Sequence, residues 1–387
     1  MRRVYFDHNA TTPIHPAIAA FVQPFLGELF GNPSSLHWTG REVRPYVDEA
    51  REQVAAMIKA KPDEIVFTAS GTEADNQAIK GAAFALSDRG NHIITTKVEH
   101  PAVLKTCRFL EDKGFSVTYL DADREGLIDP EDVRRALKRE TILVSVMYAN
   151  NETGTVLPVK EICAVAREAG VLFHSDMVQA MGKMDIDVHS LDVDLASFSG
   201  HKVYAPKGIG ALYMREGIEI DNLIHGGHQE MGRRAGTENM VGIVAFGKAC
   251  EVMTAEMADE NRRIEVLRSR LVTGLMARVD DVRLNGHPAR RLPNTLNLSF
   301  RFVEGESLLI GLDLVGIAVS AGSACSSGST EPSHVLLGMG IEPEICQSAL
   351  RISLGRVNIT EDIDYALETI PEVVGRLREI SPFYRKR

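Results

Sequence analysis

The sequence lacks any long hydrophobic run, since no stretch reaches the roughly 18 consecutive apolar residues that a membrane-spanning helix requires. Its first residues, MRRVYF, carry no apolar core of the kind found in signal peptides. Only five cysteines occur in 387 residues, and they form neither a CxxC pair nor a zinc-binding pattern. An odd number of cysteines without an export signal favours a reducing, cytoplasmic environment.

Glycine and proline are also few, at 32 and 16 residues, which excludes a fibrous or low-complexity chain. Acidic residues outnumber basic ones by 53 to 43, and the net charge of −10 argues against broad binding to nucleic acid or anionic membranes. The hydrophobic fraction of 44% is ordinary for a globular protein. At this length about two domains are expected, and their cores need neither disulfides nor a structural metal.

Short apolar strands alternate with helices through the first half of the chain. The pattern predicts strands at residues 64–68, 92–96, 116–120, 141–148, 171–174, 194–198 and 210–214, and helices at 73–86, from 101, at 130–139 and at 159–169. Such alternation is typical of βαβ units. We therefore expect an α/β fold whose mainly parallel sheet is covered by helices on both faces.

The pattern changes near residue 240. A long helix is predicted at 241–278, where it bridges into a second domain without a flexible linker. Beyond it, residues 294–300 alternate between apolar and polar, which predicts a half-exposed strand, and residues 361–380 predict an amphipathic helix.

Two charged residues follow separate predicted strands. Asp176 lies at the carboxyl end of a buried strand, where open α/β sheets bind ligands and where a carboxylate can pair with a cationic ring nitrogen. A role as a helix N-cap explains it equally well. Lys202 follows an apolar strand and a turn of small residues, and a partly desolvated lysine loses its charge readily and can form a Schiff base. Both side chains are expected on one rim of the sheet.

The segment SGTEADN (70–76) follows a strand and opens a helix, so its N–H groups can bind an anion. A capping box with Ser70 or Thr72 as the cap explains it as well. No GxGxxG or GxxxxGK[ST] motif supports a dinucleotide or P-loop site. Cys325 lies in the small, polar segment 321–330, which favours a reactive thiol, whereas the other four cysteines are interpreted as core residues.

Several other polar residues allow two interpretations each. His100 is either a helix cap or a partner stacked on a ring, and residues 150–154 are either a turn or part of a site. Arg351 and Arg356 flank a strand, and each can clamp a carboxylate or lie at the surface. The segment HGGHQ (225–229) has no cysteine or carboxylate at ligand spacing, so a glycine-rich loop is expected there rather than a metal site.

Taken together, these segments resemble the cysteine desulfurases of the NifS/IscS type, which are class V aminotransferases and fold-type-I enzymes dependent on pyridoxal 5′-phosphate (PLP). The resemblance covers essentially the whole chain. It rests on YFDHNATTP (5–13), GNPSSLH (31–37), GTEADN (71–76), VEH (98–100), NNETG (150–154), DMVQ (176–179), SGHK (199–202), RAGTEN (234–239) and GSACSSG (322–328). Their joint order and spacing carry the resemblance.

The resemblance implies a fold-type-I architecture. A large domain over residues 15–260 would hold a mainly parallel seven-stranded sheet. A small α+β domain would combine residues 1–14 with 261–387 and carry the catalytic cysteine loop at about 321–332. The family shares sites across a subunit interface, so a homodimer is expected in which Thr237 reaches the partner's cofactor.

The resemblance also implies roles for individual residues. Lys202 would hold PLP as a Schiff base and later move the Cα proton, while Asp176 would pair with the pyridinium nitrogen. His100 would stack on the ring and transfer protons. Gln179 would hydrogen-bond the ring hydroxyl. The phosphate would be held by Gly71, Thr72, Ser199, His201 and Thr237. The substrate carboxylate would be held by Arg351 and Asn151, and Asn151 would also contact the cofactor.

In this interpretation L-cysteine is converted to L-alanine, and its sulfur passes to Cys325 as a persulfide for delivery to an iron–sulfur scaffold or a tRNA-thiolation protein. No resident metal, nucleic acid or membrane is expected, although Cys325 can be an iron–sulfur ligand in a scaffold complex. Two alternatives stay open. One is a selenocysteine lyase or another PLP enzyme of this fold, and the other is a non-catalytic sulfur-relay scaffold.

Overall fold

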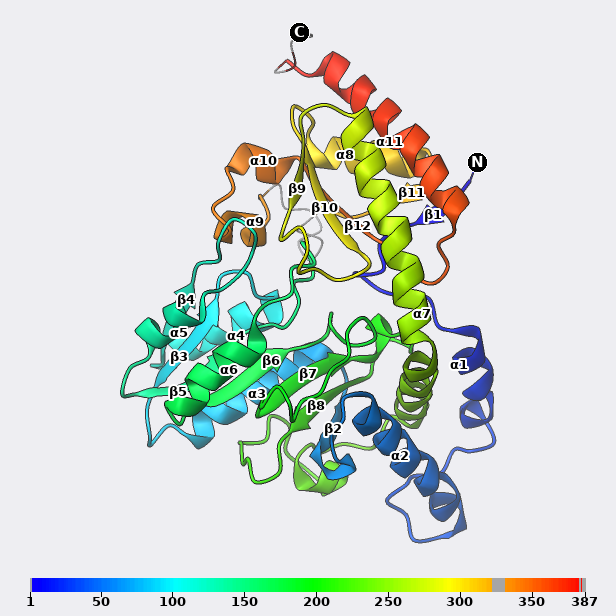
Figure 1. Cartoon of the computed structure of the whole chain (residues 1–387). Helices are drawn as coiled ribbons and strands as arrows, with labels where there is room; N and C mark the ends of the chain where they lie inside the picture. The colour runs from blue at the N-terminus through cyan, green and yellow to red at the C-terminus, as the bar shows by residue number, and fades with distance from the viewer. Residues whose placement is uncertain (1, 322–330, 383, 385–387) are drawn as a thin grey trace.

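The computed structural model describes residues 2–321, 331–382 and 384. Its largest sheet has the strand order β2-β8-β7-β6-β5-β3-β4 (Figure 1). The strands are β2 (Ile65–Thr68), β3 (His92–Thr96), β4 (Ser116–Leu120), β5 (Thr141–Ser145), β6 (Leu172–Asp176), β7 (Leu195–Ser199) and β8 (Gly210–Met214). Only β8 is antiparallel to its neighbours, β2 and β7. The predicted α/β fold with a mainly parallel seven-stranded sheet is confirmed.

Helices cover both faces of this sheet because its strands are apolar on both sides. The adjacent residues Ile93 and Ile94 of β3 enter two separate core clusters, one on each face. One cluster includes α3 (Gly71–Ala85) and α4 (Pro101–Glu111), and the other includes α2 (Trp38–Met57), α5 (Pro130–Ala136) and α6 (Val159–Glu168). Strands buried on both faces are typical of parallel α/β sheets.

A second core is built from the C-terminal part of the chain together with the N-terminal strand. It contains a three-stranded antiparallel sheet, a two-stranded parallel sheet and the helices beside them. These elements are β9 (Val282–Asn285), β10 (Thr295–Phe300), β12 (Ala349–Ser353), β1 (Val4–Tyr5), β11 (Ile317–Ala318), α8 (Gly305–Leu314) and α11 (Thr360–Ile380). Helices α9 (His334–Gly338) and α10 (Pro343–Gln347) form a small separate core that also contains Val98. Val4 pairs with Ile317, so the start of the chain is fixed to this second core.

Helix α7 (Met240–Arg278) joins the two cores, as the long helix in Figure 1 shows. Its first half contributes Phe246 and Cys250 to the core under the large sheet, and its second half contributes Leu271 and Leu275 to the second core. The boundary predicted at residues 260/261 therefore falls inside one continuous helix. None of the described helices is both long and apolar enough to cross a membrane.

Shorter elements connect these layers. They are α1 (Pro16–Phe21) and the 3₁₀ turns η1 (Gln23–Leu26), η2 (Pro62–Glu64), η3 (Gly200–Lys202) and η4 (Gln229–Gly232). Turn η3 begins the link, residues 200–209, after which β8 returns antiparallel beside β7.

The exposure predicted for residues 294–300 is wrong, because β10 is buried along its whole length. Its apolar residues enter the second core as expected. Its polar residues are covered as well, because Thr295 accepts a hydrogen bond from Asn9 and packs against Gly154, where a Cβ would come within 2.8 Å of the Thr295 Cβ. Alternation identified the strand correctly, but the sequence could not show that its polar face meets the first core.

Candidate active site

Lys202 and Asp176 follow neighbouring strands at one edge of the large sheet. Asp176 ends β6 and pairs in register with Ser197 of β7, while Lys202 ends the η3 turn directly after β7. The turn is tight because Gly200 has no side chain, since a Cβ there would come within 2.8 Å of Ile209. The positive charge of Lys202 acts to lower the Asp176 pKa. The rim predicted from the sequence is present.

The N-terminal segment closes over Lys202. The Lys202 ammonium donates to the backbone oxygens of Asn9 at 2.5 Å and Ala10 at 2.7 Å. The His201 carbonyl accepts from the Thr12 backbone and hydroxyl, and the ring of His201 lies 3.1 Å from the Thr11 hydroxyl. Residues 9–12 of the N-terminal segment therefore fix the position of this lysine.

Asp176 lies in a buried group of acids. Burial is the largest effect on its pKa, which rises to about 6 although the N–H of Val178 and the charge of Lys202 lower it. Burial raises the pKa of Glu99 to about 8, and burial together with the Asp176 charge raises the pKa of Asp75. Like charges so close cannot all ionise, so this pocket favours a cationic ligand group.

His174 lies beneath Asp176 and is neutral. Burial lowers its pKa to about 3, and its ring nitrogens lie 2.8 Å from the Ser145 hydroxyl and 3.0 Å from that of Ser197. Its Nε2 is also 3.6 Å from the Asp75 carboxylate. This network orients the acids under the sheet edge without adding a positive charge.

His100 is the N-cap of α4, which confirms the capping interpretation. Its Nδ1 accepts from the backbone N–H of Ala102 at 3.2 Å. Burial, then the charges of Lys202 and other basic neighbours, lower its pKa to about 4, so the neutral ring carries its proton on Nε2. One ligand atom each from Asp75, His100 and Asp176 lie within 4.8 Å of one another. His100 therefore lies beside the buried acids as well as at the helix end.

The start of α3 points at the same edge. Ser70 caps this helix by accepting from the N–H of Glu73 at 3.1 Å, so the predicted cap is confirmed. A Cβ on Gly71 would come within 2.7 Å of Val178 and 3.3 Å of Ser199, so only glycine allows this approach. Thr72 lines a cavity of about 410 Å³. The N–H groups at the start of a helix suit an anion.

Arg351 and Asn151 lie together against the N-terminal segment, where Arg351 pairs with Asp7 and Asn9 donates to the Asn151 carbonyl. Arg351 is only 2% exposed, and its Nη1 donates to the Asn151 carbonyl at 3.2 Å. Among the described residues, the Asn151 Oδ1 and the Arg351 Nε are buried without a hydrogen-bond partner. Arg356, the other candidate, instead pairs with Glu256 at 2.9 Å and lies over the Tyr204 ring. Of these two arginines, Arg351 is thus the one that lies at the site with a nitrogen able to donate a further hydrogen bond.

Gln179 joins the same network, whereas Thr237 does not. The Gln179 Nε2 donates to the Asn9 carbonyl at 3.1 Å, beside Lys202. Thr237 is exposed after η4, and its segment is tied to α3 through the ion pair of Arg234 with Glu73 at 2.8 Å. An exposed position leaves Thr237 accessible to a second subunit.

Cys325 and its segment 322–330 lie outside the described residues. The residues on either side do reach the site. Ser320 exchanges two backbone hydrogen bonds with Arg351, and the Ser333 hydroxyl donates to Glu152 at 2.5 Å. The other four cysteines are buried free thiols, as predicted, and burial raises the pKa of Cys107 and Cys163 to about 12.

Sequence reasoning gave no separate role to several residues of this site. They are Asp7, Asn9, Asp75, Glu99, Glu152 and Lys183. Most of them lie inside the motifs that carry the family resemblance. The motifs therefore marked these positions, but only the structure shows which atoms they contact. Only Lys183 stands outside those motifs, and its spacing of four residues from Gln179 was the available hint.

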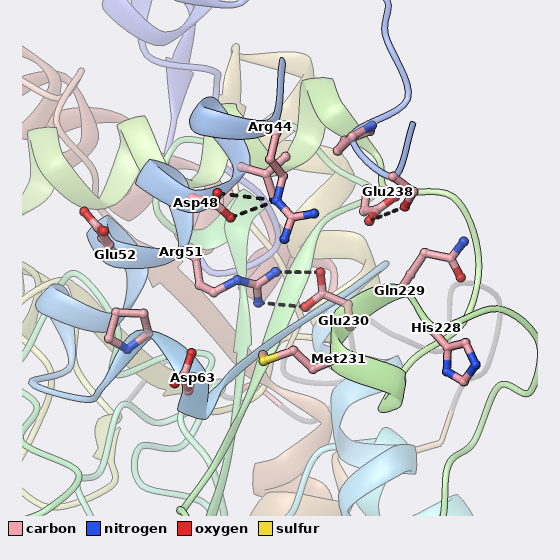
Figure 2. Close-up of a pocket in the computed structure, with 14 residues that line it drawn as sticks. Arg44, Asp48, Arg51, Glu52, Asp63, His228, Gln229, Glu230, Met231 and Glu238 are labelled. Carbon is pink, nitrogen blue, oxygen red and sulfur yellow. Dashed lines mark hydrogen bonds and ion pairs between the residues drawn. The ribbon is translucent and has the colours of Figure 1, made fainter. Parts of the chain in front are cut away.

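A larger cavity of about 520 Å³ lies elsewhere, between α2 and the η4 loop (Figure 2). Arg51 and Glu230 face each other there through two hydrogen bonds of 2.8 Å, and Glu230 also accepts from the Phe67 N–H. This buried pair holds Glu230 and Met231 at φ of 49° and 57°, a costly backbone conformation for residues other than glycine. The Ser34 hydroxyl and Glu238 meet at its rim, 3.5 Å apart. Lys202 and Asp176 do not line this cavity.

A lysine and a buried carboxyl lie here at adjacent strand ends, beside the start of a helix. Enzymes built on open α/β sheets bind their ligands at such a place. The chain belongs to the class V aminotransferase family, which matches residues 4–366. It is 51% identical over 382 residues to the protein named cysteine desulfurase IscS of Dictyoglomus turgidum, covering 99% of this chain and 97% of that protein. A protein of the same name from Methanosarcina thermophila is 50% identical over 385 residues, covering 100% and 95%.

Solved structures agree with this assignment. A NifS-like protein superposes with a TM-score of 0.92 at 40% identity, covering 97% of this chain and all of that one. The structure described as SspA in complex with cysteine has a TM-score of 0.81 at 37% identity, with 92% and 99% covered. The family resemblance seen in the sequence is therefore confirmed.

Proposed function

We propose that this protein is a PLP-dependent cysteine desulfurase, which converts L-cysteine to L-alanine and transfers the sulfur to Cys325. The observation that carries the proposal is the placement of Lys202 beside Asp176 on adjacent strand ends. The relatives named cysteine desulfurase IscS, about half identical over nearly the whole chain, support it.

The residues present fit PLP. The group of buried acids around Asp176 needs a positive partner, which a pyridinium nitrogen provides. Because Gly71 has no side chain, the start of α3 lies close to Ser199, and a helix N-terminus suits a phosphate. We propose that Asp176, Gln179 and Lys202 hold the ring, and that Gly71, Thr72, Ser199 and His201 hold the phosphate.

Bound PLP supplies an electron sink for charge that develops at the substrate Cα. The chain's own residues do the rest. Asp176 keeps the proton on the ring nitrogen, and the Lys202 amine, released from the Asn9 and Ala10 carbonyls, moves the proton at Cα. His100 donates from Nε2, since its Nδ1 is occupied by the Ala102 N–H. Arg351 and Asn151 orient the substrate carboxylate.

The overall reaction balances without an added reductant. The carbon–sulfur bond of L-cysteine breaks, the Cys325 sulfur forms a sulfur–sulfur bond, and the substrate carbon gains a proton to become the alanine methyl group. The anchors at Ser320 and Ser333 support this role, because they hold both ends of the Cys325 segment next to Arg351 and Glu152.

We extend the proposal to the assembly and the partners. A homodimer in which Thr237 completes the partner's phosphate site is supported by its exposure in the single chain. The large domain at 15–260 and small domain at 1–14 and 261–387 follow the two cores. Four buried free thiols support a reducing, cytoplasmic location. The proposed sulfur acceptor is an iron–sulfur scaffold or a tRNA-thiolation protein.

Alanine release tests the function directly. The PLP-loaded protein and its Cys325→Ala variant are incubated with L-cysteine and excess reductant. Alanine from the wild type but not from the variant is expected. Equal alanine from both would indicate a lyase that releases sulfur directly, with selenocysteine as the next substrate to test. No alanine from either, despite bound PLP, would contradict the proposal.

A further inference from the structure

Lys183 has no part in the chemistry proposed above, yet it lies in the same hydrogen-bond network. Its ammonium donates to both the backbone oxygen and the side-chain Oε1 of Gln179, each at 3.2 Å. Its own carbonyl accepts from the side chain of Asn261 on α7 at 3.1 Å. Gly182, at a φ of +74° and packed on Val203, permits the turn that directs Lys183 back to Gln179.

Lys183 fixes which end of the Gln179 amide faces Lys202. A lysine ammonium can only donate hydrogen bonds, so the amide oxygen must face Lys183. The amide nitrogen then points the other way, where it donates to the Asn9 carbonyl at 3.1 Å. The same carbonyl accepts from Lys202. The donor end of Gln179 is therefore presented on the side of the reactive lysine.

The surroundings of Lys183 are basic. Burial and the like charge of Lys202 lower its pKa to about 7, and no carboxylate among the described residues forms an ion pair with it. Burial, then the charge of Lys183, lower the pKa of His8 to about 4. Both ring nitrogens of His8 are buried without a hydrogen-bond partner among the described residues. A cluster of basic groups without an acid suits an anionic group of a ligand.

We propose that Lys183 is a positioning residue for the ring oxygen of PLP, holding Gln179 with its Nε2 toward the cofactor and strengthening that N–H as a donor to the ionised oxygen. The inference rests on the proposed function. Its physical basis is that a charge on the amide oxygen polarises the amide, and hydrogen bonds in a chain reinforce one another.

The test uses the PLP-loaded protein and two readouts besides activity. The first is the pH midpoint of the change in visible absorbance, and the second is the affinity for PLP. Lys183→Met keeps the length of the stem and removes the charge. We expect the midpoint to rise by about one pH unit, because the ring oxygen is less stabilised as an anion, and the affinity to fall about tenfold. Lys183→Arg keeps the charge, so it is expected to keep most of the wild-type midpoint and of the wild-type affinity for PLP.

Two further variants separate positioning from structural support. Asn261→Ala loosens the same turn without removing the charge, so its midpoint is expected to stay at the wild-type value. In a Gln179→Leu background, Lys183→Met is expected to add no further shift, as it acts through Gln179. If Lys183→Met does not fold, Lys183→Gln makes the same measurement.

An unchanged midpoint in the charge-removing variant would overturn the inference while leaving the proposed function intact. An equal shift in Asn261→Ala, or a full shift in the Gln179→Leu background, would also overturn it. A wild-type protein that shows no visible band with PLP would overturn the proposed function, and this inference with it.

Discussion

The buried Arg351 of β12 forms an ion pair with the half-buried Asp7 of the N-terminal segment, with 2.8 Å between Nη2 and Oδ1. The other terminal nitrogen of the same guanidinium donates to the Asn151 carbonyl. Arg351 is thus held from two sides, and its Nε has no partner among the described residues. A pre-ordered guanidinium of this kind is suited to bind a carboxylate in a fixed plane.

Replacing Arg351 by lysine tests this assignment. A lysine keeps the charge but loses the planar fork, so it cannot hold Asp7, Asn151 and a carboxylate at once. We expect the KM for L-cysteine to rise about 10- to 100-fold, the loss of one or two hydrogen bonds to a charged group, with a smaller change in kcat. Steady-state alanine formation measures both constants. Arg356→Lys is the matched control and should leave KM unchanged; equal effects of the two variants would contradict the assignment.

The buried acid Glu99 should make the protein less stable as pH rises. Its folded-state pKa of about 8 lies above the ordinary value of 4.5, mainly because of burial and also because of Asp176. The folded state therefore binds the extra proton, so stability falls between about pH 4.5 and 8 and the cost is complete above that window. Glu99→Gln removes this cost and keeps an oxygen for the N–H of Met147.

Urea unfolding of the cofactor-free protein at pH 5 and pH 8 measures the effect. Between pH 5 and pH 8, the free energy of unfolding of the variant should rise relative to that of the wild type by on the order of a few kcal/mol. The exposed Glu140→Gln is the control and should show no such gain. A difference between Glu99→Gln and wild type that stays constant with pH would show that this carboxyl is ionised throughout.

Mixed dimers test whether Thr237 serves the partner's site. Thr237→Ala is expected to weaken PLP retention, and Lys202→Ala to abolish alanine formation. The mixed dimer contains one Thr237→Ala chain and one Lys202→Ala chain. If Thr237 crosses the interface, this dimer has one complete site, with Lys202 from the Thr237→Ala chain and Thr237 from the Lys202→Ala chain. PLP retention at that site should return to the wild-type level. Retention as weak as in the Thr237→Ala dimer would place Thr237 in its own chain's site.

The sequence predicted the large sheet well because its strands are short apolar runs between helices with clear periodicity. Helix α7 was found within one residue of its observed start, since a single pattern runs through it. The burial of β10 was not predictable, because its polar residue Thr295 is covered by Asn9 and Gly154, which both lie more than a hundred residues away along the chain. Periodicity reports a strand's two faces but not what covers them.

The candidate site shows the same limit. Lys202 and Asp176 could be placed on one rim because both follow strands whose ends meet in a parallel sheet. The raised pKa values of Glu99 and Asp75 could not be anticipated, since they depend on burial and on the nearby charge of Asp176. The link from Lys183 to Gln179 also needed coordinates, because a lysine four residues from a glutamine is common on exposed helices.

The pairing of β1 with β11 sets an order for how the protein is made. Val4 leaves the ribosome early but pairs with Ile317, and the Phe6 carbonyl accepts from the Ser353 N–H. At about 5–20 residues per second, the N-terminal segment waits on the order of tens of seconds for these partners. The segment that holds the Lys202 ammonium thus gains its lasting anchor only when synthesis is nearly finished. Nascent chains are therefore expected to complete the lysine's surroundings last, which delays the site until both cores can assemble.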